Sequence, residues 1–111
     1  MAPLPNHHRA EIGIAKLREY CLSTTHLRGR HKARLFASAL GISADDAVWL
    51  RNEILKGLEN SDAIKDVSDH FGQRWRVDLL LTRQNRRAVV RTVWLTAHGQ
   101  SNPKLVTAWV L

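Results

Sequence analysis

The chain has 111 residues, 44% of them hydrophobic, which is enough to build one compact core and too little for two domains. No apolar run approaches the ~18 residues that a membrane-spanning helix needs, and the first residues lack the apolar core of a secretion signal. The single cysteine, Cys21, excludes a disulfide within the chain, so we expect a cytoplasmic protein.

The formal net charge of +7 is unevenly distributed. Residues 1–41 carry a net charge of +5, residues 42–69 carry −4 and residues 70–111 carry +6. Two basic blocks that flank an acidic segment indicate one basic surface built from both ends of the chain. Such a surface favours a nucleic acid or an acidic protein as partner. The alternative is that the basic charge only serves solubility.

Hydrophobic periodicity predicts three helices in the first half of the chain. We expect residues 1–9 to form a flexible, proline-stiffened tail, and residues 10–111 to form a single domain. Apolar residues at helical spacing predict helices over residues 10–22, 31–40 and 44–59.

Local signals mark the boundary between the second and third of these helices. Gly41 occupies the position at which a left-handed cap ends a helix. Ser43 followed by Asp46 resembles a capping box, with Asp in place of the usual Glu, that begins the next helix.

The second half of the chain changes to the alternation that is typical of strands. A polar reversal at residues 83–86 and a turn at residues 70–72 separate the candidates. The expected strands are residues 63–68, 73–82, 87–97 and 104–110. Helices followed by a run of strands predict an α+β fold, with about three N-terminal helices packed on a four-stranded antiparallel sheet.

One stretch, residues 26–34, combines two imidazoles with four cations, and no acid occurs between Glu19 and Asp45. Imidazole beside clustered cations suits phosphodiester chemistry, because the ring can carry a proton near neutral pH and the cations can stabilise the phosphate. The alternative is a basic loop that only contacts polyanions.

Three short patterns resemble an uncharacterised bacterial family, a domain of unknown function. The first is His26-x-x-Gly29-x-x-Lys32-Ala33, followed by Phe36. The second is Phe71-Gly72 before Trp75, and the third is Arg91-Thr92-Val93-Trp94 with Pro103-x-Leu105-Val106-Thr107-Ala108. The resemblance implies a toxin-like protein, and its helix-then-sheet layout is similar to the barnase, EndoU, colicin E5/D and RelE superfamily of metal-independent ribonucleases.

Under that hypothesis the cleavage of RNA needs a base, an acid and cations at the phosphate. We expect His26 to carry the proton in either role, and Lys32 and Arg28 to bind the phosphate. On the strands, the polar residues Arg91, Thr92 and Thr107 stand out in apolar surroundings, and the two threonines share a face if the last two strands pair accordingly. The alternative for such threonines is a satisfied hydroxyl in the core.

The predicted nucleic-acid contacts are Arg30, Arg34, Arg86, Arg87 and Trp94. The alternative for Trp94 is that it fills the core, as tryptophans commonly do in a domain of this size. We expect RNA and a small acidic antitoxin or immunity protein as partners, no membrane, and neither a cofactor nor a metal site. The competing hypothesis is a non-catalytic basic module that binds an acidic protein or a nucleic acid.

Overall fold

The computed structural model describes residues 2–111. In chain order its elements are η1 (His7–Arg9), α1 (Ile14–Lys16), the π-helical turn η2 (Leu17–Cys21), α2 (Arg30–Leu40), η3 (Ala44–Asp46), α3 (Ala47–Gly57), η4 (Leu58–Asn60), β1 (Ala63–Asp69), β2 (Gly72–Arg83), β3 (Arg86–Ala97) and β4 (Lys104–Val110). The helices precede one antiparallel sheet with strand order β1-β2-β3-β4, which confirms the predicted α+β fold.

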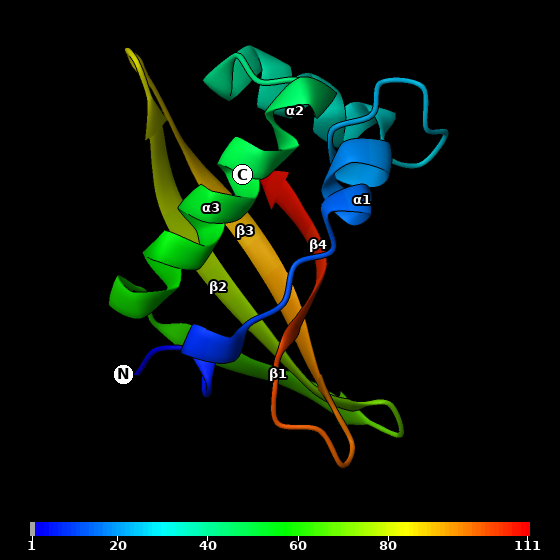
Figure 1. Cartoon of the computed structure of the whole chain (residues 1–111), viewed down its shortest axis with the longest axis vertical. Coiled ribbons are helices and arrows are strands. Elements are labelled where there is room, and N and C mark those ends of the chain that lie inside the picture. Colours follow the sequence, from blue (N-terminus) through cyan, green and yellow to red (C-terminus); the bar gives the residue numbers. More distant parts are fainter. Residues whose placement is uncertain (1) are drawn as a thin grey trace.

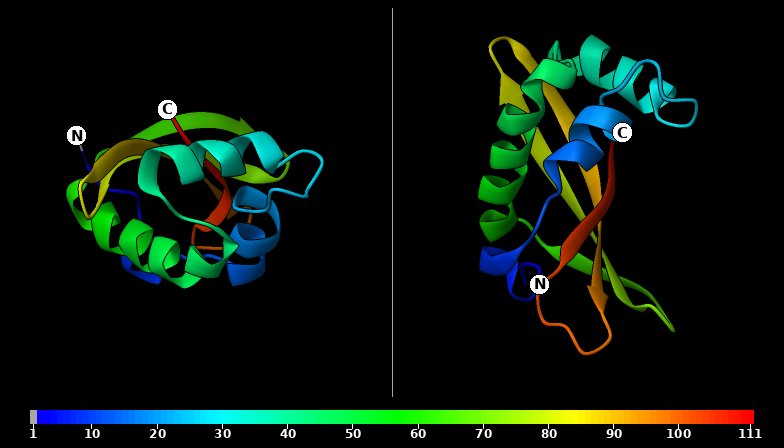
Figure 2. Two further views of the ribbon diagram at one scale, coloured as in Figure 1. Left: turned by 90° about the horizontal axis from the view of Figure 1, so that it is seen from above. Right: turned by 45° about the vertical axis from the view of Figure 1, so that its right-hand side comes forward.

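The helices α1 and α3 lie against one face of the sheet (Figure 1). Two further views show that α3 runs along this face and α2 crosses its end, whereas the opposite face carries no helix (Figure 2). The alternation along β2 fits this arrangement, because Val77, Leu79 and Leu81 are buried and the residues between them are more exposed. Phe36 of α2 and Trp94 of β3 are the largest side chains that are fully buried between the two layers.

The predicted boundary between α2 and α3 is confirmed. Gly41 has a φ of 68°, and its N–H donates to the Ala37 carbonyl at 2.9 Å, so a left-handed glycine ends α2. The capping box is present, with the Asp46 carboxylate accepting the Ser43 N–H at 2.9 Å. This bond from the Ser43 backbone lowers the pKa of Asp46, and the nearby Arg83 lowers it further.

The first helix differs from its prediction, because it begins at Ile14 rather than at Ala10. The preceding residues run beside β4 instead, where the Glu11 N–H donates to the Pro103 carbonyl and the Leu105 N–H donates to the Glu11 carbonyl, each at 2.9 Å. The edge of β4 offers unpaired backbone groups, so pairing with it takes the place of the first helical turn.

Residues 2–9 do not form the flexible tail that was predicted for residues 1–9. Met1 lies outside the described residues. Leu4 is only 1% exposed and belongs to the core. The Ala2 carbonyl accepts the Ala63 N–H at 2.8 Å, and the Asn6 side chain donates to the Ser101 carbonyl at 2.9 Å. The segment packs against the domain because burial of the apolar Leu4 side chain is more favourable than its exposure to water.

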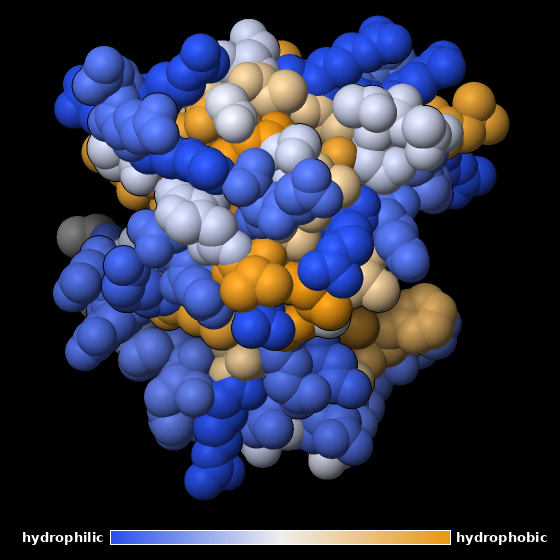
Figure 3. All heavy atoms as spheres, turned by 45° about the horizontal axis from the view of Figure 1, so that its top comes forward, coloured by the Kyte–Doolittle hydropathy of each residue, from blue (hydrophilic) through white to orange (hydrophobic). Residues whose placement is uncertain are grey.

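The surface is mainly hydrophilic, with apolar atoms showing through in patches on the helix-bearing side (Figure 3). Exposed apolar side chains include Leu27 before α2 and Leu35 on it. No helix among residues 2–111 is both long and apolar enough to cross a membrane.

Candidate functional site

The candidate site starts at the loop between η2 and α2, where His26 closes a tight turn. Its ring atom Nδ1 accepts the backbone N–H of Arg28 at 3.1 Å and that of Gly29 at 3.0 Å. Two donors aimed at Nδ1 leave no room for a proton there, so the neutral ring carries its proton on Nε2. In this conformation Nε2 is the ring atom that can donate a hydrogen bond to a ligand, so the predicted role of His26 as a proton carrier in either direction narrows to that of a donor.

Gly29 explains the spacing of the His-x-x-Gly pattern. A Cβ at this position would collide with the Tyr20 carbonyl oxygen, and would also meet the Tyr20 ring. Only glycine allows the loop to pass this close to η2. The same residue supplies one of the two amides that hold His26.

Replacing Gly29 with Ala is expected to lower the free energy of unfolding by about 1–3 kcal/mol, the usual cost of overpacking. Because the loop must move away from Tyr20, the hydrogen bond from the Gly29 N–H to His26 is lost as well. The control is Gly13→Ala, because a Cβ at Gly13 meets no atom within 4 Å and its φ of −68° suits alanine. Urea unfolding of both variants is the measurement, and equal stabilities would contradict this steric account.

Tyr20 joins His26 to the rest of the site, and sequence analysis missed it. Its ring stacks on His26 with centroids 4.7 Å apart and 12° between the planes. Tyr20 lies in the π-helical turn η2, where the Leu22 N–H donates to the Leu17 carbonyl at 2.8 Å. Such turns are rare and occur often at functional sites. The available signal was an aromatic residue off the apolar stripe of the first helix.

Lys32, in the first turn of α2, also lies beside the Tyr20 ring. Its Nζ donates to Thr107 Oγ1 at 3.1 Å, and lies 5.5 Å from the centroid of the Tyr20 ring and 5.0 Å from that of Trp109. Within residues 2–111, none of the salt bridges involves Lys32. A half-buried ammonium held by a hydroxyl and two aromatic faces keeps its charge available for an anion.

A shallow hollow beside the Tyr20–His26 pair gives a ligand access to these two side chains. It is lined by Ala15, Lys16, Glu19, Tyr20 and His26. The charge at this place is mixed, since Lys16 and Glu19 both border it.

The predicted strand residues do not all reach the site. Thr92 is buried, and its hydroxyl donates to the Val77 carbonyl at 2.7 Å and accepts the Trp94 indole N–H at 2.8 Å. Its assignment as a catalytic residue is therefore corrected to a satisfied core hydroxyl. Trp94 is fully buried too, so the predicted stacking of a base on it is wrong.

The register of β3 with β4 shows that Thr92 and Thr107 do not share a face, which the sequence had left open. Thr92 pairs with Ala108, and Thr107 pairs with Val93, so the two side chains point to opposite faces. The cause is a bulge, because the register shifts between Val93 and Trp94.

Arg91 lies on the helix-free face of the sheet and is held by Asp78. Its Nε and one terminal nitrogen each donate to an Asp78 oxygen at 2.9 Å. These hydrogen bonds lower the pKa of Asp78 and raise the pKa of Arg91. Arg91 is therefore a fixed, oriented cation rather than a free one.

The remaining predicted contacts are dispersed. Arg28, Arg30 and Arg34 are exposed on the loop and on α2. Arg86 is exposed but its guanidinium donates to the Ser38 carbonyl at 2.9 Å, near the end of α2. Arg87 is exposed on the sheet. The structure thus brings together His26, Lys32 and Thr107, and leaves the other predicted cations around them or apart.

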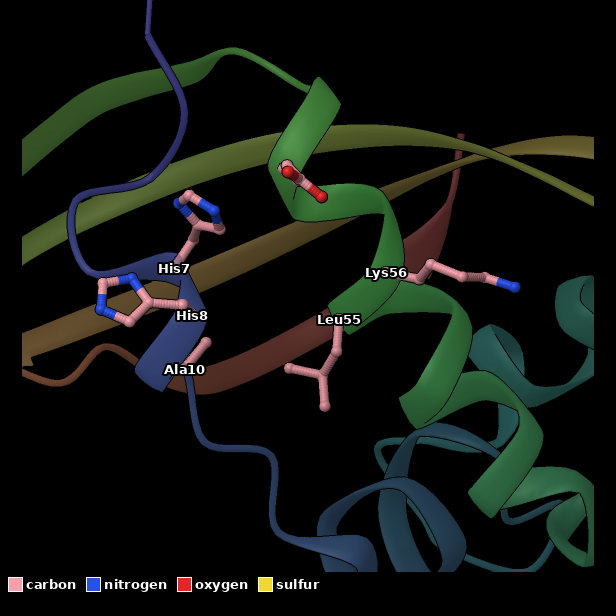
Figure 4. Close-up of a pocket in the computed structure, with 6 residues that line it drawn as sticks. His7, His8, Ala10, Leu55 and Lys56 are labelled. Carbon is pink, nitrogen blue, oxygen red and sulfur yellow. The ribbon is translucent and has the colours of Figure 1, made fainter.

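A second hollow lies far from this cluster, between η1 and α3, and is lined by His7, His8, Ala10, Leu55, Lys56 and Glu59 (Figure 4). Across residues 2–111 no three His, Cys, Asp or Glu side chains gather as a group that could hold a metal ion. This hollow shares no residue with the cluster around Tyr20.

Comparison with known proteins places these residues in a family context. A family described as a domain of unknown function, DUF6883, matches residues 3–111. No curated protein and no solved structure matches the chain significantly. The resemblance to a family of unknown function is confirmed, and all residues of the candidate site lie within the matched region.

Proposed function

We propose that this chain, which belongs to the DUF6883 family of domains of unknown function, is a metal-independent endoribonuclease. The observation that carries the proposal is that His26 and Lys32 both lie beside the Tyr20 ring, His26 stacked on it with centroids 4.7 Å apart and the Lys32 ammonium 5.5 Å from its centroid. Each can donate a hydrogen bond to a phosphate oxygen, the imidazole through Nε2 and the ammonium through Nζ. Both are donors to negative charge, which is the property that the transition state of phosphodiester cleavage requires.

The reaction that suits these groups is internal transesterification. The 2′-oxygen of a ribose bonds to the adjacent phosphorus, the bond from phosphorus to the 5′-oxygen of the next nucleotide breaks, and a 2′,3′-cyclic phosphate forms. The 2′-hydroxyl loses one proton to solvent and the leaving 5′-oxygen gains one. Lys32 Nζ and His26 Nε2–H stabilise the extra charge on the non-bridging oxygens in between. Thr107 orients the ammonium.

The biological setting that we propose is a toxin with a neutralising partner, either an antitoxin or an immunity protein. We expect this partner to be small and acidic. Its acidity would match the basic charge of the chain, since an inhibitor has to cover the basic surface that meets RNA. Lys32, which takes part in none of the salt bridges within residues 2–111, is the contact that we propose for an acidic side chain of this partner.

The competing hypothesis is a basic module that binds RNA or an acidic protein without cleaving anything. Incubation of total RNA with the purified chain in EDTA separates the two. We expect fragments with cyclic-phosphate and 5′-hydroxyl ends, which resist tailing by poly(A) polymerase until dilute acid opens the cyclic phosphate and a phosphatase then removes it. RNA that is bound but recovered intact would favour the module.

A further inference from the structure

The helix-free face of the sheet is basic, partly apolar and continuous with the candidate site. Its side chains from β2, β3 and β4 include Arg76, Leu80, Arg87, Arg91, Thr107 and Trp109. Leu80 is 63% exposed, so nothing in residues 2–111 covers this part of the face.

One row of cross-strand neighbours leads from the centre of this face to Lys32. Asp78 on β2 pairs with Arg91 on β3, and Arg91 pairs with Trp109 on β4. Trp109 then lies under the Lys32 ammonium, 5.0 Å from Nζ to the ring centroid. The row therefore joins an oriented guanidinium, an aromatic ring and the ammonium of the site.

The neighbouring row ends at the same lysine. Arg76 on β2 pairs with Val93 on β3, and Val93 pairs with Thr107 on β4, whose hydroxyl accepts the hydrogen bond from Lys32. Arg76 takes part in none of the salt bridges within residues 2–111, and its buried Nε has no hydrogen-bond partner there. Both rows end at Lys32, so the candidate site lies at the edge of the helix-free face.

We propose that the helix-free face binds a single-stranded segment of the RNA substrate and leads it across β2, β3 and β4 to Lys32 and His26. This inference rests on the proposed function and adds where the substrate lies and which form of RNA it is. An RNA strand that crosses these three β-strands spans about 10 Å of the sheet, since neighbouring β-strands lie about 4.8 Å apart.

The chemistry of the face favours single-stranded RNA over other occupants. Trp109 is only half-buried, and an aromatic ring at a surface can stack an unpaired base. Arg76 and Arg87 have no acidic partner among the described salt bridges, and can neutralise phosphates. A second copy of the chain would oppose like charges on this face.

The test measures binding apart from cleavage. The probe is a fluorescein-labelled 2′-O-methyl oligouridine of 12 nucleotides, which lacks the free 2′-hydroxyl that cleavage requires. We expect Trp109→Ala to weaken binding about 5- to 150-fold, the loss of one stacked base. The double variant Arg76→Gln/Arg87→Gln should lower the slope of log affinity against log salt by about 0.7 for each lost phosphate contact.

Two matched double variants control for loss of charge alone. Arg51→Gln/Lys56→Gln removes two cations from α3 in the opposite layer, and should leave the slope unchanged. Arg30→Gln/Arg34→Gln removes two exposed cations from α2, which are two of the nucleic-acid contacts predicted from the sequence and lie outside the helix-free face. A loss of slope in the α2 variant but not in the Arg76/Arg87 variant would overturn the inference.

The remaining outcomes are equally distinct. If neither Trp109→Ala nor the Arg76/Arg87 variant affects the probe, and both are folded by circular dichroism, the face does not bind RNA and an acidic protein is its better occupant. If the probe depends on the face but total RNA is never cleaved, the inference stands as a binding surface and the proposed ribonuclease activity fails.

Discussion

Replacing His26 with Asn is expected to lower the rate of RNA cleavage by about 10²–10³-fold, the usual effect of removing one donor to transition-state charge. The Asn side-chain oxygen can accept the amides of Arg28 and Gly29 in place of Nδ1, as Asn does in local turns. The loop therefore keeps its conformation, while the donor at the position of Nε2 is lost. Initial rates on total RNA in EDTA, with thermal melts of each variant, are the measurement.

His26→Gln separates two roles for the ring. The Gln amide nitrogen reaches the position of Nε2 and donates a hydrogen bond, but it carries no proton that titrates near neutral pH. Provided that the Gln variant melts at the temperature of the Asn variant, which shows that the loop tolerates the loss of the acceptor at Nδ1, a donor role predicts that Gln retains clearly more activity than Asn. A proton-transfer role predicts that both are equally poor. His31→Asn is the matched control, since His31 is an exposed histidine of the same basic stretch. A folded His26→Asn variant that cleaves at the wild-type rate would remove His26 from the site.

Where local chemistry decides the structure, the sequence was sufficient. Alternating apolar and polar residues predicted β2, and the polar reversal after it is the β2–β3 turn, where Gln84 has a φ of 54°. Gly41 and the Ser43–Asp46 pair act on their own neighbours, so their caps are readable from a few residues. The layout of helices on one sheet then follows from the order of the elements.

Where distant segments compete, the sequence was not sufficient. The first helix begins late because the residues before Ile14 pair with β4, about ninety residues away along the chain. The placement of Thr107 depends on the bulge in β4. With Trp94 opposite Leu105, an unbulged ladder would set Thr92 opposite Thr107, and the shift of one residue turns Thr107 to the helix-free face.

The candidate site was predicted in part for the same reason. His26, Gly29 and Lys32 lie close together in the chain, so their spacing identified them. Tyr20 reaches the site because of the π-helical turn, which hydrophobic periodicity does not predict. Trp109 reaches it because of the register of β3 with β4. The tautomer of His26 depends on two backbone amides that only the folded loop presents.

Replacing Lys32 with Met is expected to lower the rate of RNA cleavage by about 10²–10³-fold. Met keeps an unbranched apolar stem against Tyr20 and Trp109 but carries no charge for the phosphate. Lys32→Arg should not restore full activity, because a planar guanidinium does not reproduce a point charge seated between a hydroxyl and two rings. Arg34→Met, at an exposed position of the same helix, is the control for loss of charge.

Thr107→Val tests whether the position of the ammonium matters in addition to its charge. The change removes the hydroxyl that accepts the bond from Lys32 and leaves the charge in place. We therefore expect a smaller loss of rate than in Lys32→Met, with the order wild type, Thr107→Val, Lys32→Met. Rates measured under single-turnover conditions in EDTA give this order directly. If Lys32→Met is folded and as active as the wild type, the ammonium has no part in catalysis, and the hydroxyl of Thr107 loses its assigned role with it.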